Sequence, residues 1–352
     1  MPIPEALDSL LRIAGPSGQE APAAAAWRAL CEPFAAEVDV DVNGSSWARV
    51  PGTAGGPVLA LAGHIDEIGV QVSHIDDDGF LRIGQVGGWD PVQLVGQRIA
   101  LNTRSGELRG VIGRKALHLM DAEERKQAPE LKSLYVDIGA ASGEDARALV
   151  RIGDMGVIDV APVELRNGRV ASRALDNRVG CYVAWRAAQL VAQAGGAAGD
   201  VLALAVVQEE IGLQGAMTSA FRHRPEVAIV IDVTQASDTP GAELGPDTHH
   251  KLGSGPAIAR GPLLHPRVCD LLCEAAEAEG IPYTLEPTGR STGTDADAFT
   301  VSRAGIPTGL VDVPLRYMHS AVETISLDDL ESTARLLAAF AMRLEPGERF
   351  AR

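Results

Sequence analysis

Acidic side chains follow two of the apolar runs in this sequence. Glu209 and Glu210 come directly after the run "VLALAVVQ", and Asp232 ends the run "VAIVID". A carboxylate at the end of a buried strand is costly unless a cation or a proton pairs with it, and adjacent carboxylates also repel each other. The sequence therefore raises the question of which positive charge these side chains face.

Residues of similar chemistry follow other predicted elements. His64 and Asp66 come after the run "VLALAG", His319 lies a few residues after "TGLVDVP", and Asp176 begins a predicted helix. In open α/β sheets, ligands bind beyond the carboxyl ends of the strands, so these side chains are expected at one rim. Mixed nitrogen and oxygen ligands suit Zn²⁺, or a neighbour such as Co²⁺ or Mn²⁺. The pattern predicts a metal site.

Each of these residues also has an ordinary structural explanation. Asp176 could cap its helix, Glu210 could pair with an arginine, and His319 could be a core histidine with one hydrogen bond. Their joint placement after independent strands favours the metal site. Asp66 lies two residues from His64, so both side chains face the same side of an extended chain. The Asp66 carboxylate is therefore placed to orient the imidazole, although a solvated strand-end aspartate would look the same.

The elements that must position these side chains alternate between strand and helix after residue 170. Predicted helices span 177–194, 213–223, 265–280 and 295–304, and a last helix starts at Ser326. Predicted strands span 201–208, 227–232, 283–287 and 308–313. Such alternation indicates an α/β fold with a mostly parallel mixed sheet flanked by helices on both faces. The strand that ends at Gly63 is expected to join that sheet.

The N-terminal part is predicted to be helical. Apolar residues recur at helical spacing over residues 3–14. Ser17 and Glu20 then have the spacing of a capping box that opens an Ala-rich helix reaching about residue 37.

The segment 68–162 has a different pattern of apolar and polar residues. Short alternating runs such as "GVQVSHI", "FLRIGQV" and "RIALNT" are separated by turn sequences, which indicates a small β-barrel-like domain. We therefore predict a catalytic α/β domain in two parts, residues 1–67 and 163–352, with an inserted β-rich domain between them.

Composition narrows the class of protein. The chain has 352 residues, of which 46% are hydrophobic, and 31 basic residues face 47 acidic ones for a net charge of −16. An acidic balance without a Lys/Arg-rich run argues against nucleic acid or an anionic membrane as the main partner. We see no secretory signal and no run long enough to span a membrane. The four cysteines lack a disulfide spacing, so reduced thiols and a cytoplasmic location are expected.

Five motifs in this order carry a resemblance to a known family. They are "GHIDEIG", "ALDNRVG", "VVQEEIGLQGA", "VIDVT" and "MHSAVETI". Together they resemble the tetrahedral, or TET, aminopeptidases, which include glutamyl and deblocking aminopeptidases and proteins once labelled cellulase M. The resemblance covers nearly the whole chain, including the β-rich insertion. It implies a co-catalytic metallopeptidase with two divalent ions per subunit, with zinc as the first choice and cobalt or manganese as alternatives.

The resemblance also implies a role for each motif residue. Asp176 would bridge the two ions. His64 and Asp232 would complete one metal site, and Glu210 and His319 would complete the other.

Further roles follow from the same resemblance. Glu209 would be the general base, with Asp66 behind His64, and the peptide bond after the bridging aspartate would be cis. A similar Thr-Asp-Ala segment lies near the substrate pocket of the family, which makes Asp295 a candidate substrate-binding residue. The alternative is that Asp295 only complements the N-terminus of the following helix. The sequence assigns no role to His249 and His250.

The predicted function is the removal of N-terminal residues from short peptides with a free N-terminus. An aminoacylase, a deblocking enzyme or a carboxypeptidase would use the same metal cage and remains an alternative. A glycoside hydrolase fits less well because it needs an acid and a nucleophile or base rather than such a cage. A purely structural metal site would leave Glu209 without a role. The resemblance further implies dimers, formed through the β-rich insertion, that assemble into a dodecamer.

Overall fold

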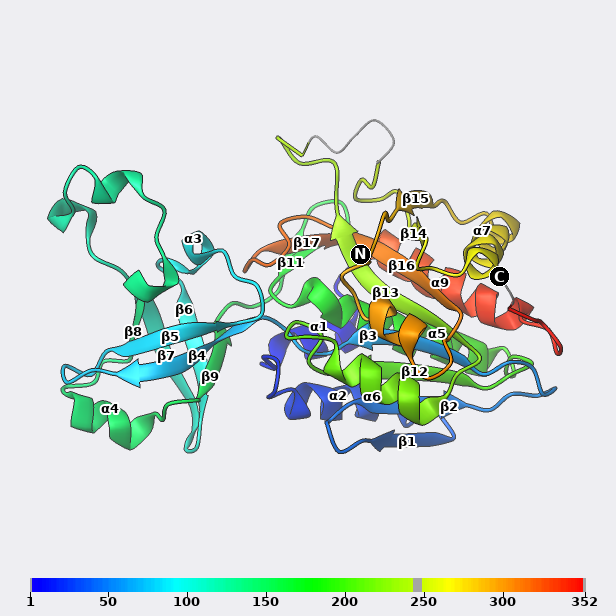
Figure 1. Ribbon diagram of the computed structural model, residues 1–352, viewed down its shortest axis with the longest axis horizontal. Helices are drawn as coiled ribbons and strands as arrows, with labels where there is room; N and C mark the ends of the chain where they lie inside the picture. Colours follow the sequence, from blue (N-terminus) through cyan, green and yellow to red (C-terminus); the bar gives the residue numbers. More distant parts are fainter. Residues whose placement is uncertain (1, 243–248, 351–352) are drawn as a thin grey trace.

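One sheet runs through the larger part of the molecule (Figure 1). The structure is a computed structural model that describes residues 2–242 and 249–350. In chain order, the strands of this sheet are β1 (Glu37–Val40), β2 (Ser46–Val50), β3 (Leu59–His64), β12 (Val201–Val206), β13 (Val227–Gln235), β14 (Ala257–Arg260), β15 (Thr284–Pro287) and β16 (Thr308–Leu315).

The order across this sheet is β1-β2-β12-β3-β13-β16-β14-β15. The central strands β12, β3, β13 and β16 pair in parallel, and so do β14 and β15. The pairs β1–β2, β2–β12 and β14–β16 are antiparallel. The predicted α/β fold with a mostly parallel mixed sheet is confirmed, and the strand through Gly63 lies at its centre.

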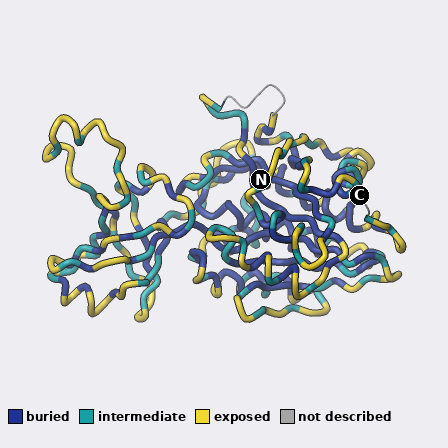
Figure 2. The backbone as a smooth tube through the Cα atoms, viewed as in Figure 1, coloured by how far each residue is buried: buried dark blue, intermediate teal, exposed yellow. Residues whose placement is uncertain are grey.

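Helices cover both faces of this sheet. They are α1 (Glu5–Arg12), α2 (Ala21–Cys31), α5 (Leu175–Gln193), α6 (Gln214–His223), α7 (Pro266–Glu279), α8 (Ala296–Val301) and α9 (Leu327–Arg343). Helix α5 packs against β3, β12, β13 and α9 on one face, while α6 and α8 pack together on the other. Figure 2 shows that the buried residues concentrate in this layered part.

The central strands are apolar on both sides because both faces are covered. Leu59 and Leu61 of β3 belong to the core under α5, whereas Ala60 and Ala62 belong to the core under α6 and α8. Successive side chains on a strand point to opposite faces, so an almost continuous apolar run is needed here. This explains why the central strands that precede the candidate site residues are mostly apolar over their whole length.

A closed barrel projects from the sheet (left in Figure 1). Its strands are β4 (Gly69–Ile75), β5 (Leu81–Val86), β6 (Arg98–Thr103), β7 (Gly106–Gly113), β8 (Tyr135–Asp137) and β9 (Met155–Ile158). The short helices α3 (Pro91–Leu94), η1 (Leu117–Leu119), η2 (Glu124–Lys126), η3 (Leu131–Ser133) and α4 (Gly143–Leu149) lie between them. The confirmed fold class includes this barrel, and its predicted domain boundaries and role in dimerisation stay predictions.

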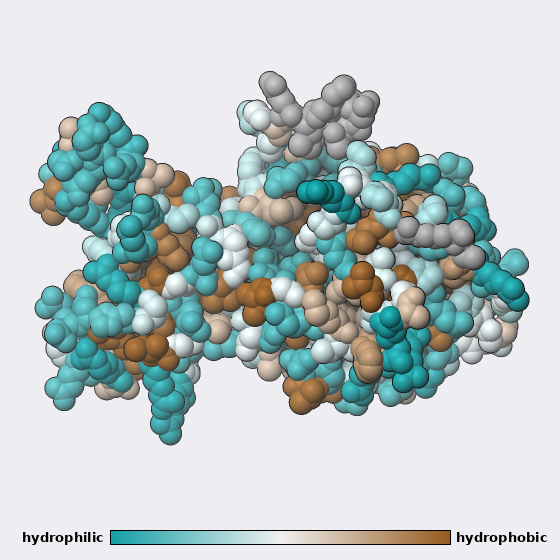
Figure 3. Space-filling view, viewed as in Figure 1, coloured by the Kyte–Doolittle hydropathy of each residue, from teal (hydrophilic) through white to brown (hydrophobic). Residues whose placement is uncertain are grey.

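Two smaller features complete the fold. A three-stranded sheet joins β10 (Val163–Leu165), β11 (Arg169–Ser172) and β17 (Glu323–Ser326). The space-filling view shows mostly hydrophilic residues over the loop that carries η1 to η3 (Figure 3), with Leu117 and Leu119 exposed among them. Of the helices in the described ranges, none has the length and hydropathy of a membrane span.

The predicted capping box near the N-terminus is wrong. The Ser17 hydroxyl donates to Asp66 Oδ2 at 2.5 Å, and Glu20 Oε1 accepts from the Gly18 N–H at 2.7 Å. Helix α2 therefore begins without a side-chain cap, and it ends at Cys31 rather than near residue 37. Pro33 follows two residues later, and the residue before a proline is disfavoured in a helix.

Strand β3 and helix α5 approach each other closely at two glycines, and this approach places the first predicted metal ligands. A Cβ atom added to Gly63 would lie 2.6 Å from the Cys181 nitrogen and 2.8 Å from Gly180 Cα. His64 ends β3 and Asp176 lies at the start of α5. Only glycine lets the two backbones come this close, so the glycine pair sets the separation of these side chains.

We expect Gly63→Ala to lower the free energy of unfolding by about 1–3 kcal/mol, because the added methyl group forces the strand and the helix apart. The matched control is Gly84→Ala in β5, where an added Cβ meets no atom within 4 Å. Urea unfolding of both variants gives the comparison. Equal midpoints for the two variants would show that the close approach does not constrain the fold.

Candidate active site

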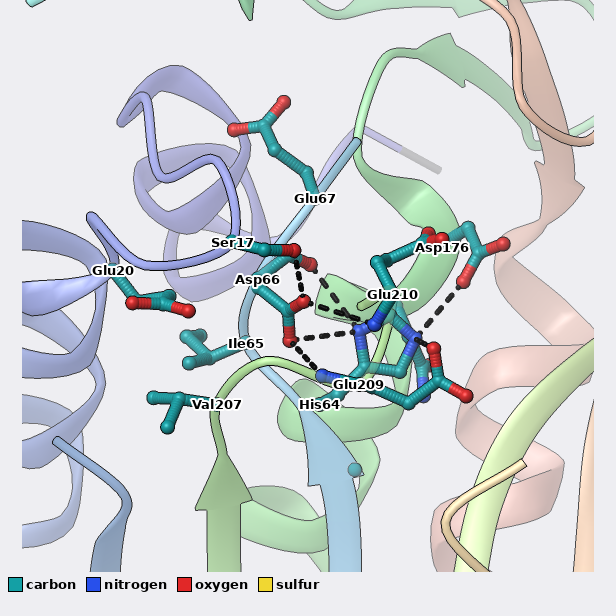
Figure 4. A network of polar contacts seen from close by, with 12 residues as sticks. Ser17, Glu20, His64, Ile65, Asp66, Glu67, Asp176, Val207, Glu209 and Glu210 are labelled. Carbon is teal, nitrogen blue, oxygen red and sulfur yellow. Dashed lines mark hydrogen bonds and ion pairs between the residues drawn. The ribbon is translucent and has the colours of Figure 1, made fainter. Parts of the chain in front are cut away.

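The turn after β12 carries the two adjacent glutamates, Glu209 and Glu210. The strand ends at Val206, two residues earlier than predicted, and Gln208 has a φ of 59° in the left-handed region. The chain therefore turns before Glu209, so neither glutamate follows the regular alternation of the strand (Figure 4). The backbone N–H groups of Glu209 and Glu210 donate to the two oxygens of Asp66 at 3.1 and 3.2 Å.

Asp66 is a fully buried carboxylate that joins three segments of the chain. Besides the glutamate turn, it accepts a hydrogen bond from Ser17, and its Oδ1 lies 3.4 Å from His64 Nδ1. Burial opposes ionisation of Asp66, but the contacts with His64, Ser17 and the Glu209 N–H hold its pKa below the usual value. Asp66 thus lies behind His64, as predicted, and it also fixes the turn that bears the glutamates.

Asp176 lies between two imidazoles. Its Oδ1 is 3.2 Å from His64 Nε2, and its Oδ2 is 3.5 Å from His319 Nε2. The same His319 nitrogen is 3.5 Å from Glu210 Oε1. The backbone of Asp176 is not helical, and its peptide bond to Asn177 is cis, as the resemblance implied. Each oxygen of one carboxylate therefore faces a different histidine.

Two groups of side chains around Asp176 have the composition of metal sites. In each group the potential ligand atoms lie within 4.8 Å of one another, and the groups are His64 with Asp176 and Asp232, and Asp176 with Glu210 and His319. They contain the five ligands that the resemblance implied and share the aspartate that would bridge the ions. The donors are imidazole nitrogen and carboxylate oxygen, which zinc, cobalt and manganese accept. His64, Glu209 and Glu210 form a third such group.

Charge is concentrated among these side chains. Burial raises the pKa of Asp232 well above its usual range and raises the pKa of Glu209 to about 8. The pKa of His319 is raised to about 11 because Asp176 and Glu210 lie beside it. Burial thus opposes ionisation of carboxyl groups in this cluster, and a bound divalent cation would offset their negative charge. The residues present therefore fit divalent cations.

A cavity of about 650 Å³ opens over this cluster. It is lined by His64, Gly88, Asp176, Glu209, Glu210, Leu213, Asp232, Val233, Thr234, Gln235, Glu286, Thr292, Gly293, Thr294, Met318 and His319. All of the predicted ligands and Glu209 reach this cavity, whose volume suits a small ligand.

The predicted substrate-binding residue Asp295 does not line this cavity. That residue is buried next to Thr294 in the chain, neither of its carboxylate oxygens has a partner among the described residues, and burial raises its pKa to about 7.

Comparison with known proteins decides the family. The sequence model of the M42 glutamyl aminopeptidase family matches residues 44–336, which is more than half of the chain. The chain belongs to the M42 glutamyl aminopeptidase family. The predicted enzyme class, a peptide hydrolase of the aminopeptidase type, is thereby confirmed.

Individual relatives agree with this M42 assignment. A lysyl aminopeptidase of Pyrococcus furiosus is 37% identical over 313 residues, which cover 88% of each chain. The structure of a TET aminopeptidase from a marine-sediment Thaumarchaeota archaeon superposes with a TM-score of 0.91 at 34% identity, covering 97% of this chain and 96% of that one. The Pyrococcus horikoshii TET1 peptidase has a TM-score of 0.84 at 32% identity, covering 97% and 99% of the two chains.

The site of this M42 protein includes a residue that the sequence analysis missed. Glu323 is buried, and its two oxygens accept the backbone N–H groups of Asp176 at 3.1 Å and His319 at 3.0 Å. It therefore fixes the backbone at two of the predicted ligands. The signal was present in the motif "MHSAVETI", where a lone glutamate follows the histidine in an otherwise uncharged segment.

Proposed function

We propose that this chain is a dinuclear, metal-dependent aminopeptidase that removes N-terminal residues from short peptides. The observation that carries the proposal is the position of Asp176, whose two oxygens face His64 and His319 separately. A carboxylate shared by two ligand groups is suited to bridge two cations. In the proposal, His64 and Asp232 complete one site, and Glu210 and His319 complete the other.

The ions would supply Lewis-acid polarisation of the scissile carbonyl and an acidified water molecule. The chain supplies the remaining chemistry. Glu209 lines the cavity beside this cluster, and one of its oxygens is 3.9 Å from His64 Nε2. We assign it as the general base that takes a proton from the attacking water and returns it to the leaving amine.

Asp66 and Glu323 act as positioning residues in this proposal. Asp66 contacts His64 and the backbone of both glutamates, and Glu323 holds the backbone of Asp176 and His319. Neither side chain lines the large cavity. Such outer partners fix the orientation and basicity of the residues that touch metal or substrate.

The proposed substrate has a free N-terminus and small size. An ammonium group suits this cavity because two of its carboxylates, Glu209 and Glu286, are not assigned to a metal site. The family is described as glutamyl aminopeptidases, whereas the Pyrococcus furiosus relative is named a lysyl aminopeptidase. The names of these relatives therefore indicate different preferences for the N-terminal residue of the substrate.

Assembly is a second part of the proposal. The Pyrococcus horikoshii TET1 peptidase can assemble into a tetrahedron or a large octahedral shell. We propose that this chain forms dimers that build a dodecamer. Light scattering tests this proposal, and a monomeric or dimeric mass at micromolar concentration would contradict the higher assembly.

A paired turnover assay tests the catalytic proposal. We expect that chelator-treated protein is inactive and that Zn²⁺, Co²⁺ or Mn²⁺ restores cleavage of amino-acid p-nitroanilides with a free amine. N-acetylated peptides and substrates with only a free C-terminus serve as controls. Cleavage of the acetylated substrate alone would instead indicate a deblocking enzyme or aminoacylase, and cleavage from the C-terminus would indicate a carboxypeptidase.

A further inference from the structure

The far wall of the cavity contains a carboxylate that the proposed chemistry does not use. Glu286 lies on β15, at the edge of the main sheet, and lines the same cavity as the predicted metal ligands. Its Oε1 accepts a hydrogen bond from the Thr234 hydroxyl at 2.9 Å. Thr234 belongs to β13, which also carries Asp232, so this contact ties the edge strand to the strand of the metal cluster.

Behind Glu286 lie two almost completely buried polar side chains with unpaired atoms. Glu286 Oε2 lies 3.9 Å from His250 Nε2, and neither atom has a hydrogen-bond partner in the described structure. Asp312, which lies beside Glu286 and is 3% exposed, also has one carboxylate oxygen without a partner among the described residues. A buried polar atom without a partner costs free energy, so the wall around Glu286 keeps polar atoms for which the described residues supply no partner.

No cation of the described protein neutralises Glu286. Burial lowers the pKa of His250, which favours the neutral imidazole, and its Nδ1 already contacts the Thr284 hydroxyl at 2.6 Å. Within the described residues, no Lys or Arg lines the cavity or forms an ion pair with Glu286. The Glu286 side chain is 23% exposed, so it is partly desolvated but still reachable from the cavity. A partly desolvated carboxylate without a cationic partner contributes binding free energy when a ligand supplies the cation.

We propose that Glu286 determines specificity for a basic first residue, so that peptides beginning with lysine or arginine are the preferred substrates. The inference rests on the proposed aminopeptidase function and deepens it by naming the substrate class. A lysine or arginine side chain would donate charge-assisted hydrogen bonds to Glu286, while a first-residue glutamate would meet like charge and an aliphatic side chain would leave the carboxylate unpaired. The role is separate from the predicted ligands and from Glu209.

The test compares lysyl and norleucyl p-nitroanilides on the full-length, metal-restored enzyme. Norleucine has the apolar stem of lysine without the ammonium group, so the pair isolates the charge. We expect kcat/KM to be at least about tenfold higher for the lysyl substrate, because a site that binds a polar group discriminates against the analogue that lacks it. In a wider panel, the lysyl and arginyl substrates should be the best and the glutamyl substrate the worst.

The variant Glu286→Gln should reduce the lysyl-to-norleucyl ratio of kcat/KM by about tenfold, since it keeps the shape of the side chain and removes the charge. The control Glu32→Gln makes the same chemical change at an exposed position after α2 and should leave the ratio unchanged. An equal loss for both substrates would overturn the inference, because it would show that Glu286 holds the α-amino group common to every substrate. A wild-type ratio near one would also overturn it.

Calorimetry with the free amino acids separates this inference from the proposed function. L-lysine should bind the metal-loaded protein at least about tenfold more tightly than L-norleucine, and Glu286→Gln should remove the difference. Tighter lysine binding without turnover of any substrate would refute the aminopeptidase proposal but support the specificity of Glu286 for a basic side chain. Turnover of every p-nitroanilide with equal binding of both amino acids would refute the specificity and keep the aminopeptidase.

Discussion

Glu209→Gln is expected to lower turnover by about 10²–10⁴-fold, the range that a positioned general base contributes, while the protein still binds two divalent ions. The physical reason is that the two adjacent glutamates have different proposed roles, Glu210 as a metal ligand and Glu209 as the base. Glu210 lies 3.5 Å from His319 in one of the candidate metal sites, whereas Glu209 belongs to neither of the two groups that share Asp176. The glutamine keeps the size of the side chain but cannot accept the proton of the attacking water.

The matched comparison is Glu210→Gln, which makes the same chemical change one residue later. We expect this variant to lose one of its two ions, so that both metal content and turnover fall. Elemental analysis after gel filtration and steady-state kinetics with a free-amine p-nitroanilide distinguish the two variants. Near-normal turnover of Glu209→Gln with both ions present would show that Glu209 is not the base. Loss of an ion from Glu209→Gln would instead place Glu209 among the ligands.

Asp176→Ala is expected to weaken the binding of both ions, by more than the roughly 10–100-fold that loss of an outer partner of a metal ligand costs. Asp176 supplies a ligand atom to both groups, with one oxygen near His64 and the other near His319. Removing it leaves His64 with Asp232 in one group and Glu210 with His319 in the other. Two protein ligands are fewer than catalytic zinc sites use.

His319→Ala provides the contrast, because that residue belongs to one group only. This variant should keep one ion and lose the other. Isothermal titration calorimetry of the chelator-treated variants with Zn²⁺ gives the number of bound ions and their affinities. Two tightly bound ions in Asp176→Ala would contradict the bridging role, and loss of both ions from His319→Ala would contradict the division into two sites.

Predicted bounds of strands and helices were close to the observed ones where the apolar pattern was long. The strand predicted over 227–232 is β13, which continues to Gln235, and the helix predicted over 177–194 is α5. Central strands covered on both faces need continuous apolar runs, and such runs are visible in a sequence without knowledge of the tertiary structure. The fold class therefore followed from local patterns.

Predictions were less accurate where a polar side chain could choose between local and distant partners. Ser17 had the spacing of a helix cap, yet its hydroxyl donates to Asp66, 49 residues away. Glu323 was overlooked although the His319 N–H lies only four residues away, because its other partner, the Asp176 N–H, lies 147 residues away in the chain. The contact of Glu286 with Thr234 spans 52 residues and depends on the order of the strands in the sheet.

The sequence by itself determined which residue types end each strand, and hence that two imidazoles and several carboxylates would meet beyond the sheet. Parallel strands present their carboxyl ends at one edge, so this follows from strand direction alone. Only the tertiary structure decided that Asp176 faces both histidines and that Asp66 holds the glutamate turn. These contacts depend on the close approach of β3 to α5 at Gly63 and on the packing of distant segments, which local sequence patterns do not encode.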